Sequence, residues 1–384
     1  MKILMLSNHY LPHVSGVATS ITRTIRNLEK LGHEVRLIVP AFPGFTETNP
    51  KIYRVPSYPF RPPLIPLPYP GKSFIAKVVA EFKPDIIHTH QPFLLGKTAL
   101  KVARKNHIPF VFTHHAMYEQ YVHYASFLPK SLLQKIVVKR VMRFANKVSA
   151  VVAPSESVEK ILYQRKIKTP VTVIPTGINP QFFVRNSEVR NATRKKWGIK
   201  ETETVIISFA RLSKEKNFEL LLKAFALIQE KTKKSLRLIL GGDGPATGSL
   251  KRLATKLGLK EKIIFSGSFP HEEVPDFLIG ADIFAYPSLS ETQGLVTLEA
   301  LATGLPAVVV DAPGNRDIVT NGINGLITKP TVNDFATKLL SIIESPKLRD
   351  SLAEKSIPRA NEFSEEKMVR KMTELYQSLI EKKK

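Results

Sequence analysis

Residues 204–210 read TVIISFA, and charged residues follow directly, among them Arg211 and Lys216. A predominantly apolar run of this length is typical of a parallel β-strand that is buried on both faces. Similar runs precede and follow it, and they alternate with amphipathic stretches of helical periodicity such as 15–31 and 95–105. This alternation predicts an α/β, doubly wound fold.

The strand-like runs form two sets, and a segment rich in turn formers, 175–180 (PTGINP), lies between them as a predicted hinge. A chain of 384 residues is also too long for one ordinary core. We therefore expect the GT-B type of architecture, with two Rossmann-like domains, 1–176 and 177–363, facing each other across a cleft. A C-terminal helix at about 364–384 is expected to pack back on the first domain. The predicted strands are 2–6, 34–39, 85–89, 110–113 and 147–153, then 204–210, 236–241, 263–266, 283–286, 307–310 and 325–327.

The composition excludes several classes of protein. There is no cysteine, so disulfides, thiolate catalysis and cysteine-ligated metals are ruled out. The apolar run within residues 1–12 is too short for a signal peptide, and no stretch reaches the roughly 20 apolar residues of a membrane span. We therefore expect a protein that is soluble or lies on a surface. The GxGxxG fingerprint is absent, which weighs against a nicotinamide or flavin enzyme.

The net charge of +24 is unevenly distributed. Residues 1–176 hold 25 Lys and Arg against 8 Asp and Glu, whereas 177–384 hold 32 against 25. Such an excess favours a polyanionic partner, either nucleic acid or an anionic membrane. No motif typical of DNA or RNA recognition accompanies the charge, so the membrane is the better candidate.

Two carboxylates lie eight positions apart in 291–299 (ETQGLVTLE). Glu291 precedes a predicted helix, Glu299 lies two turns along it, and the backbone amides near Gly294 and Leu295 would form an anion site where the helix begins. A nucleotide diphosphate fits this arrangement, with one carboxylate near the transferred sugar and the other near the ribose. The alternative explanation for an isolated pair of this kind is a solvated helix face.

A pair of cations, Arg211 and Lys216, follows the strand that opens the second set. Cations at that place can neutralise a diphosphate leaving group, although surface charge is the alternative explanation. Near the N-terminus, Ser15 and Gly16 lie in a loop that leads into the first predicted helix. Gly16 would let the backbone approach a phosphate closely.

Taken in order along nearly the whole chain, these motifs resemble the retaining family 4 glycosyltransferases of the GT-B class. The family often has Gly-Gly where Ser15 and Gly16 stand, so the first position departs from the pattern. The motifs that carry the resemblance are the opening strand with its glycine loop, 154–156, 174–178, the Arg211 and Lys216 pair, 241–245, and 291–299.

The resemblance implies a nucleotide-sugar donor, and it gives the matched positions their roles. Arg211 and Lys216 would hold the donor diphosphate, Glu299 the ribose and Glu291 the sugar hydroxyls. Enzymes of this class generally need no metal, and the sequence has no Asp-x-Asp motif to bind one, so we expect neither metal nor cofactor. Donor-binding roles fall on Gly16, Arg211, Lys216, Ser268, Phe269, Gln293, Gly294, Leu295, Val296 and Glu299, with the nucleobase at Ser268 and Phe269.

A further stretch, 112–124 (FTHHAMYEQYVHY), resembles the acceptor-side motif of bacterial diacylglycerol glucosyltransferases. By that match His115 is the active-site histidine, and His114 is the alternative one position away. Tyr118 and Tyr121 would lie on the acceptor side. The resemblance thus implies catalytic roles for His115, Arg211, Lys216 and Glu291.

Residues 128–147 follow this motif and combine apolar residues at helical spacing with cations, and no acidic residue occurs between Glu119 and Glu156. A basic amphipathic helix of this kind can lie in an anionic bilayer interface. The alternative is a domain-packing helix with a solvated basic face. Its cations include Lys130, Lys135, Lys139, Arg140 and Arg143.

Together with the basic helix, the resemblance implies a metal-independent hexosyltransferase that moves glucose from UDP-glucose to membrane 1,2-diacylglycerol with retention of configuration. It would be a peripheral protein on the cytoplasmic face of the membrane. The nearest alternative is a mannosyltransferase that uses GDP-mannose and a phosphatidylinositol-type lipid. A transferase with a soluble acceptor, an epimerase of the same fold and a basic nucleic-acid-binding protein are further alternatives.

Overall fold

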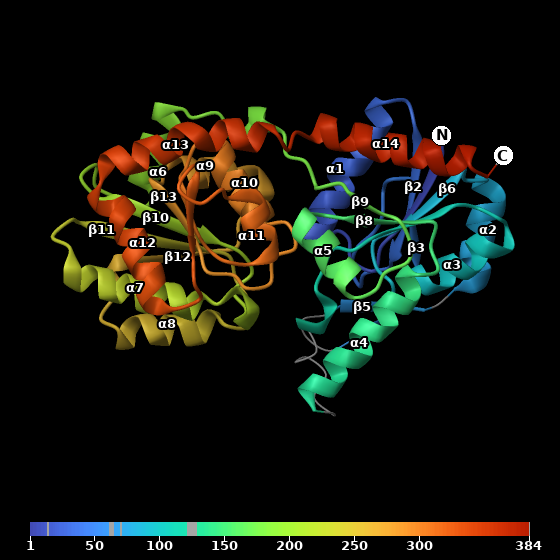
Figure 1. The fold of residues 1–384 in the computed structure, drawn as a ribbon, viewed down its shortest axis with the longest axis horizontal. Coiled ribbons are helices and arrows are strands. Elements are labelled where there is room, and N and C mark those ends of the chain that lie inside the picture. Colours follow the sequence, from blue (N-terminus) through green and yellow to red (C-terminus); the bar gives the residue numbers. More distant parts are fainter. Residues whose placement is uncertain (14, 61–64, 70, 121–128, 384) are drawn as a thin grey trace. The chain divides into compact units, whose positions relative to one another are not determined.

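The computed structural model describes residues 1–13, 15–60, 65–69, 71–120 and 129–383. The chain divides into two compact units (Figure 1). Unit 1 consists of Met1–Gly177 and Glu365–Lys384, and unit 2 is the uninterrupted segment Ile178–Ser364. Each unit is built around its own parallel sheet, so the predicted pair of Rossmann-like folds is confirmed.

The sheet of unit 1 has seven parallel strands in the order β3-β2-β1-β6-β7-β8-β9. The chain first runs outward from β1 to β3 and then returns to the other side of β1, so the direction of winding reverses between β1 and β6. In a doubly wound sheet, ligands bind beyond the carboxyl ends of the strands at this reversal. The strands are β1 (Lys2–Leu6), β2 (Glu34–Pro40), β3 (Ile52–Val55), β6 (Ile86–Thr89), β7 (Phe110–Thr113), β8 (Ala150–Ala153) and β9 (Val171–Val173).

Helices cover both faces of this sheet (Figure 1). Because side chains alternate along a strand, Ile3 and Met5 of β1 pack with α1 and α14, whereas Leu4 and Leu6 belong to the core on the opposite face. The C-terminal helix α14 therefore belongs to unit 1. The helices are α1 (Gly16–Lys30) and α14 (Glu365–Glu381) on one face, and α2 (Lys72–Phe82), α3 (Leu95–Lys105), α4 (Lys130–Ala145) and α5 (Glu156–Gln164) on the other.

A small antiparallel hairpin, β4 (Ser57–Phe60) with β5 (Ile65–Pro68), precedes α2. Tyr58 and Tyr69 are 67% and 60% exposed, and their rings contact each other edge to face at 6.1 Å. Two exposed aromatic side chains thus lie together at this hairpin.

The sheet of unit 2 has six parallel strands in the order β12-β11-β10-β13-β14-β15, so its winding reverses between β10 and β13. The strands are β10 (Thr204–Phe209), β11 (Leu236–Gly241), β12 (Ile263–Gly267), β13 (Ile283–Tyr286), β14 (Ala307–Val310) and β15 (Gly325–Thr328). The helices are α6 (Ser187–Lys196), α7 (Phe218–Lys231), α8 (Thr247–Lys256), α9 (Val274–Ile279), α10 (Leu295–Ala302), α11 (Pro313–Ile318), α12 (Val332–Glu344) and α13 (Pro346–Asn361).

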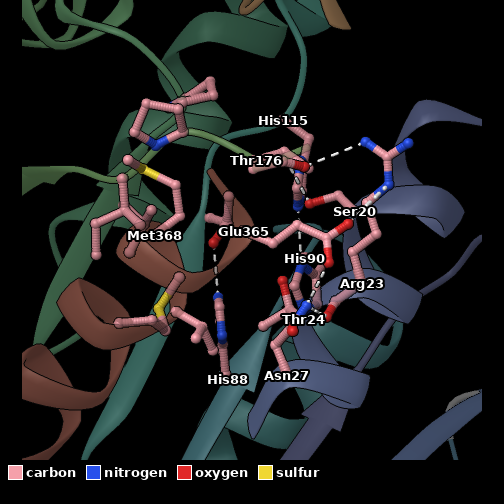
Figure 2. Close-up of a pocket in the computed structure, with 18 residues that line it drawn as sticks. Ser20, Arg23, Thr24, Asn27, His88, His90, His115, Thr176, Glu365 and Met368 are labelled. Carbon is pink, nitrogen blue, oxygen red and sulfur yellow. Dashed lines mark hydrogen bonds and ion pairs between the residues drawn. The ribbon is translucent and has the colours of Figure 1, made fainter. Parts of the chain in front are cut away.

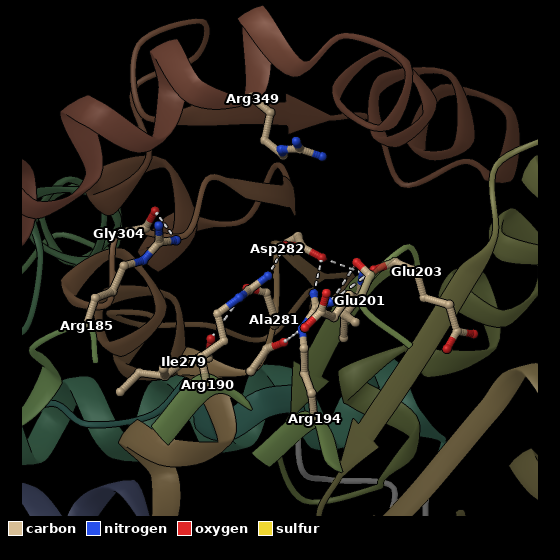
Figure 3. Close-up of polar contacts among 12 residues, drawn as sticks. Arg185, Arg190, Arg194, Glu201, Glu203, Ile279, Ala281, Asp282, Gly304 and Arg349 are labelled. Carbon is tan, nitrogen blue, oxygen red and sulfur yellow. Dashed lines mark hydrogen bonds and ion pairs between the residues drawn. The ribbon is translucent and has the colours of Figure 1, made fainter. Parts of the chain in front are cut away.

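A cluster of arginines lies at the amino-end edge of this second sheet. Figure 3 shows Arg190 and Arg194 of α6 pointing toward Asp282, which they contact at 2.6 and 2.7 Å. Asp282 also accepts a hydrogen bond from the backbone N–H of Val205 in β10. The cluster therefore fastens α6 to the edge of the sheet that is opposite the carboxyl ends, and its role is structural.

The two points where the chain passes between the units are bound within each unit. In unit 2, the N–H of Ile178 donates to the carbonyl of Phe363 at 2.9 Å, and Ile178 forms a bridge with Ser364. In unit 1, the buried Arg23 of α1 donates to the carbonyl of Gly177 at 3.2 Å and lies 3.6 Å from Glu365. A single guanidinium thus contacts both the last residue before the chain enters unit 2 and the first residue after it returns to unit 1.

In the part of the chain that the structure describes, no helix has the length and apolar character needed to cross a membrane.

Candidate functional site

The reversal between β10 and β13 brings two loops together at the carboxyl ends of these strands in unit 2. The loop after β10 carries Arg211 and Lys216, and the loop after β13 carries Glu291. The two loops are bonded to each other, since the N–H of Leu289 donates to the carbonyl of Glu215 and Lys216 contacts Glu291. The fold therefore gathers these sequence-predicted residues at one place.

Glu291 is the centre of this cluster. Its side chain is buried, and Oε1 accepts hydrogen bonds from Lys216 Nζ at 2.5 Å, from the hydroxyl of Tyr286 at 2.8 Å and from the hydroxyl of Ser288 at 2.7 Å. Burial by itself would raise the pKa of Glu291, but the charge of Lys216 and the three hydrogen bonds outweigh it, so the pKa is lowered. Glu291 is therefore an ionised hydrogen-bond acceptor at neutral pH.

Arg211 lies on the same loop as Lys216, and its side chain is 40% exposed. It donates to Oε1 of Glu215 at 2.8 Å, and the same oxygen accepts the hydroxyl of Ser213 at 2.7 Å. This arrangement orients the guanidinium from one side while it stays open to solvent. An exposed, oriented arginine is suited to bidentate binding of a phosphate group.

Helix α10 begins beside this cation pair. Gly294 precedes it in the left-handed conformation (φ 78°), and no side chain caps the helix, so its first amides remain available to an anion. The loop packs tightly on the start of α11, because a Cβ added to Gly314 would lie 2.3 Å from the backbone nitrogen of Gln293. Leu295 and Val296, in the first turn, are partly buried.

Asn315 holds this loop in place, and sequence reasoning did not find it. Its side-chain amide donates to the carbonyls of Val310 at 3.0 Å and Ser288 at 3.4 Å, and its Oδ1 lies 3.4 Å from the hydroxyl of Thr297. One fully buried side chain thus joins β14, the Glu291 loop and α10. The signal for it in the sequence, an Asn that follows Pro-Gly after an apolar run, is too common to identify.

The predicted ribose and nucleobase residues lie along the same side of unit 2. Glu299 is buried on α10, and its Oε1 lies 3.8 Å from Nε2 of His271. His271 follows the loop that carries Ser268 and Phe269, so the carboxylate and this loop are neighbours. Ser268 is exposed, whereas Phe269 is partly buried and stacks on Phe277 at 4.3 Å.

The glycines after β11 pack against the backbone of the loop that carries Arg211 and Lys216. A Cβ on Gly242 would lie 2.0 Å from the carbonyl oxygen of Ala210, and a Cβ on Gly244 would lie 2.4 Å from that of Leu212. Close backbone packing therefore requires both glycines. The structure thus provides a packing reason for residues 241–245.

In unit 1, three histidines line a pocket at the carboxyl ends of the strands, between α1 and α14 (Figure 2). The rings follow one another from His88 at the end of β6 through His90 to His115 after β7. The rings of His88 and His90 stack at 4.4 Å, and Nδ1 of His90 lies 2.8 Å from Nε2 of His115. Ser20 and Arg23 of α1 and Glu365 of α14 complete the pocket.

All three imidazoles are held neutral. Burial lowers the pKa of His88 to about 3 and that of His115 to about 4, and it lowers the pKa of His90 well below its ordinary value, with smaller contributions from the neighbouring histidines. These rings therefore act as hydrogen-bonding groups near neutral pH. Sequence reasoning missed His88 and His90. The signal was present, since the sequence His-Thr-His at 88–90 ends an apolar run in β6, next to the point where the winding of the sheet reverses.

The two adjacent histidines of the acceptor-side motif point to different sides of the sheet. His115 lines the pocket, whereas His114 is buried against Phe112 and Tyr118. Among the described residues, neither ring nitrogen of His114 has a hydrogen-bond partner. Tyr118 packs on the core beside Phe93, and Tyr121 lies outside the described residues.

Ser15 and Gly16 start helix α1. The hydroxyl of Ser15 accepts a hydrogen bond from the N–H of Ala18 at 3.2 Å, which makes Ser15 the N-cap, and Gly16 is the exposed first residue of the helix. The departure from the family's Gly-Gly pattern therefore has a local role, because the serine satisfies an amide that a glycine would leave open.

Helix α4 combines two roles along its length. Its last two turns, with Val141 and Phe144, are buried in the core of unit 1, whereas Leu132 near its start is 46% exposed. The expected apolar stripe is thus buried only toward the C-terminal end. The five cations singled out from the sequence, Lys130, Lys135, Lys139, Arg140 and Arg143, are all exposed.

An open groove runs between α4 and the end of α5. Its floor includes the apolar side chains of Val138 and Met142. Arg165 stands on the α5 side, where it pairs with Glu119 at 2.6 Å. The cations that line the groove are Lys135, Lys139, Arg143, Lys147 and Arg165. An apolar floor with a cationic rim is complementary to an amphiphile that carries an anionic headgroup.

Within the ranges that the structure describes, no three His, Cys, Asp or Glu side chains are arranged to hold a metal ion.

The fold and these sites define a glycosyltransferase. A model described as Glycosyltransferase Family 4 matches residues 14–182, and one described as Glycosyl transferases group 1 matches residues 189–359. The chain belongs to the family 4 glycosyltransferases of the GT-B class.

Two curated relatives are similar over nearly the whole chain. The alpha-monoglucosyldiacylglycerol synthase of Streptococcus pneumoniae is 34% identical over 99% of this chain and 86% of its own length. The enzyme of the same name from Acholeplasma laidlawii is 31% identical over 100% of this chain and 98% of its own length. Among solved structures, HepE of Anabaena in complex with UDP has the same fold, with a TM-score of 0.81 and 21% identity over 98% of this chain and 100% of its own.

Proposed function

We propose that this protein transfers glucose from UDP-glucose to the free hydroxyl of 1,2-diacylglycerol, with retention of configuration, while bound to an anionic membrane surface. Both curated relatives carry names of diacylglycerol-glucosylating enzymes. Such a reaction needs a site for the donor, which we place in unit 2, and a surface that binds the membrane, which we place at the exposed cations of α4 in unit 1.

The observation that carries the proposal is the gathering of charges at the start of α10. Lys216, the exposed Arg211 and the uncapped amides of α10 are cationic or positively polarised groups at one edge of unit 2. A diphosphate that leaves with extra negative charge is stabilised most by donors that are fixed in advance. Glu291, ionised and rigidly bonded, is suited to accept hydrogen bonds from sugar hydroxyls rather than to take a proton.

The chemistry can proceed without a strong protein base. The bond between the anomeric carbon and the diphosphate oxygen breaks, the acceptor oxygen bonds to the same face of that carbon, and the acceptor proton passes to the departing diphosphate. The neutral imidazole of His115 would support the sugar through a hydrogen bond. The proposed roles of Glu299 at the ribose and of the loop with Ser268 at the nucleobase agree with their neighbourhood on unit 2.

The membrane-binding part of the proposal rests on the groove beside α4 and on the exposed tyrosine pair. Cations such as Lys135 and Arg143 would attract the anionic phospholipids of the bilayer, and Val138 with Met142 would contact the glycerol backbone and first methylenes of a lipid. Tyr58 and Tyr69 are side chains of the type that prefers a membrane–water interface. We therefore place the protein peripherally on the membrane.

The direct test is incubation of the protein with UDP-glucose, UDP-galactose or GDP-mannose, each with liposomes of diacylglycerol and anionic phospholipid. Mass spectrometry identifies the glycolipid, and the proton coupling at the anomeric carbon gives its configuration. We expect an α-glucosyl product from UDP-glucose, its loss in Lys216→Ala, and its retention in Lys223→Ala, a solvent-exposed lysine of α7. Absence of glycolipid from every donor would contradict the proposal, and product from GDP-mannose alone would favour the mannosyltransferase.

A further inference from the structure

His90 is the middle ring of the three histidines in the unit 1 pocket, and its position is fixed on both sides. On one side it stacks on His88, whose ring is itself anchored at both nitrogens. Nδ1 of His88 lies 2.5 Å from the hydroxyl of Tyr376 in α14, and Nε2 lies 2.7 Å from the hydroxyl of Thr113 in β7. On the other side, Nδ1 of His90 is bonded to Nε2 of His115 at 2.8 Å.

The bond between His90 and His115 contains one proton, and the surroundings of His90 decide which ring supplies it. His90 is 2% exposed, and its Nε2 has no hydrogen-bond partner among the described residues. If His115 donated the proton, neutral His90 would carry its own hydrogen on Nε2, buried and without an acceptor. If His90 donates from Nδ1, its Nε2 is an unpaired lone pair instead. In folded proteins, a buried N–H without an acceptor is rarer than a buried acceptor without a donor, so donation by His90 is favoured.

We propose that His90 is a positioning residue that fixes the tautomer of His115, donating its Nδ1–H to Nε2 of His115 so that His115 carries its proton on Nδ1. In this state Nε2 of His115 is occupied, and the nitrogen left for other contacts is a donor. His115 then acts as a hydrogen-bond donor to an oxygen atom and has no free basic nitrogen. This assignment adds a tautomer to the role proposed for His115. The tautomer itself follows from the geometry, whereas its importance for catalysis rests on the proposed function.

Nitrogen NMR of the full-length protein labelled with 15N-histidine tests the tautomer without any substrate. Two-bond 15N–1H correlations distinguish a ring protonated on Nδ1 from one protonated on Nε2, and the His115→Gln spectrum identifies the signals of His115. We expect the Nδ1–H form in the wild-type protein at pH 7.5 and its loss or mixing in His90→Ala. His90→Asn, whose amide places a donor near the position of Nδ1, should restore it.

The matched control is His107→Asn, which removes an exposed imidazole of the same unit at a left-handed position that asparagine tolerates (φ 53°). Its spectrum should keep the His115 pattern. A wild-type His115 protonated on Nε2 overturns the proposal directly, even if His90→Ala fails to fold. An unchanged tautomer in a folded His90→Ala also overturns it.

Kinetics provide the second measurement. Losing a partner that orients an active-site ring costs roughly 10- to 100-fold in activity, so His90→Ala should lower kcat by that amount and change KM for UDP-glucose little, with recovery in His90→Asn. The two proposals fail separately. A correct tautomer in a protein that makes no glycolipid contradicts the function alone, whereas an active protein with the Nε2–H form contradicts the positioning role alone.

Discussion

The Nζ atom of Lys216 lies 2.5 Å from Oε1 of Glu291, although 75 positions separate the two residues in the chain. The contact joins the loop after β10 to the loop after β13, the two strands between which the winding of the sheet reverses. It leaves an ionised carboxylate and a cation side by side at the start of α10. The lysine is thereby held in place before any diphosphate arrives.

Removing this lysine should damage both activity and stability. Lys216→Ala takes away a fixed cation, so we expect kcat/KM for UDP-glucose to fall by about 10²- to 10³-fold. It also leaves Glu291 buried without its counter-charge, which should cost about 3 kcal/mol of unfolding free energy. Steady-state kinetics and thermal unfolding measure the two effects, with Lys223→Ala as the control.

A double variant separates these two effects. Lys216→Ala combined with Glu291→Gln should recover part of the lost melting temperature, because no uncompensated charge remains, but it should recover no activity. Additive losses of stability in the double variant would show that Lys216 and Glu291 are not energetically coupled.

Glu299 should contribute to binding of the nucleotide itself. A buried carboxylate that accepts ribose hydroxyls forms charge-assisted hydrogen bonds, and losing them should weaken UDP binding roughly 10- to 100-fold in Glu299→Gln. Isothermal titration with UDP measures the change. Glu273→Gln, a solvent-exposed glutamate close to His271, is the control and should bind UDP normally. Equal affinities for UDP in these two variants would remove Glu299 from the nucleotide site.

The buried histidines should make the protein sensitive to acid. Burial lowers the pKa of His114 to about 3, below the ordinary value of 6.5, so the unfolded chain binds more protons between these values. Stability contributed by the neutral ring is therefore complete above about pH 6.5 and is lost as the pH falls, at up to about 1.4 kcal/mol per pH unit for each histidine.

A single substitution tests this dependence. His114→Phe places an apolar ring among Phe112 and Tyr118, where the imidazole nitrogens have no partners among the described residues. We expect its melting temperature to fall less than that of the wild-type protein between pH 7.5 and pH 5, while the two proteins are similarly stable at pH 7.5. An identical fall in both proteins would show that His114 does not titrate in this way.

The cations along α4 should govern membrane binding. Each surface cation contributes about 1 kcal/mol to binding of an anionic bilayer, so reversing Lys135, Lys139 and Arg143 to glutamate should weaken liposome binding by at least 100-fold. UDP affinity should stay unchanged. Reversing three exposed lysines of α3, Lys97, Lys101 and Lys105, changes the net charge equally and is the control. Binding is measured by sedimentation with anionic vesicles. If both triple variants lose vesicle binding equally, the net charge of the protein, and not the groove, governs membrane binding.

Much of the fold follows from local sequence. Strands such as β10 and β13 are continuous apolar runs, and the charged residues after them mark the carboxyl ends, so Arg211 and Glu291 were recognisable as candidates. Their closeness depends on β10 and β13 being neighbours, which the order of strands in the sequence does not reveal, so only the family resemblance led us to expect it. The short strands β3 and β9 escaped prediction because neither is a long apolar run.

The histidine pocket shows where sequence reasoning stops. The acceptor-side motif drew attention to His115, but its partner His90 comes from a strand end 25 positions earlier, and His88 is anchored to Tyr376, 288 positions away. Such contacts depend on where α14 packs. On α4, helical periodicity predicted an apolar stripe, whereas core packing buries it mainly in the C-terminal turns and leaves Leu132 near the start 46% exposed.

The pairing of Ile178 with the residues around Ser364 has a consequence for how the two units can be recombined by protein engineering. Unit 2 is an insert in unit 1 at a single place, and the residues where the chain enters and leaves it are bonded to each other. Deleting the insert would leave Gly177 and Glu365 on the same arginine, close enough for a short graft to join them. Under the proposed function, donor specificity should therefore be exchangeable between relatives by swapping this one contiguous segment, while the rest of the chain stays unchanged.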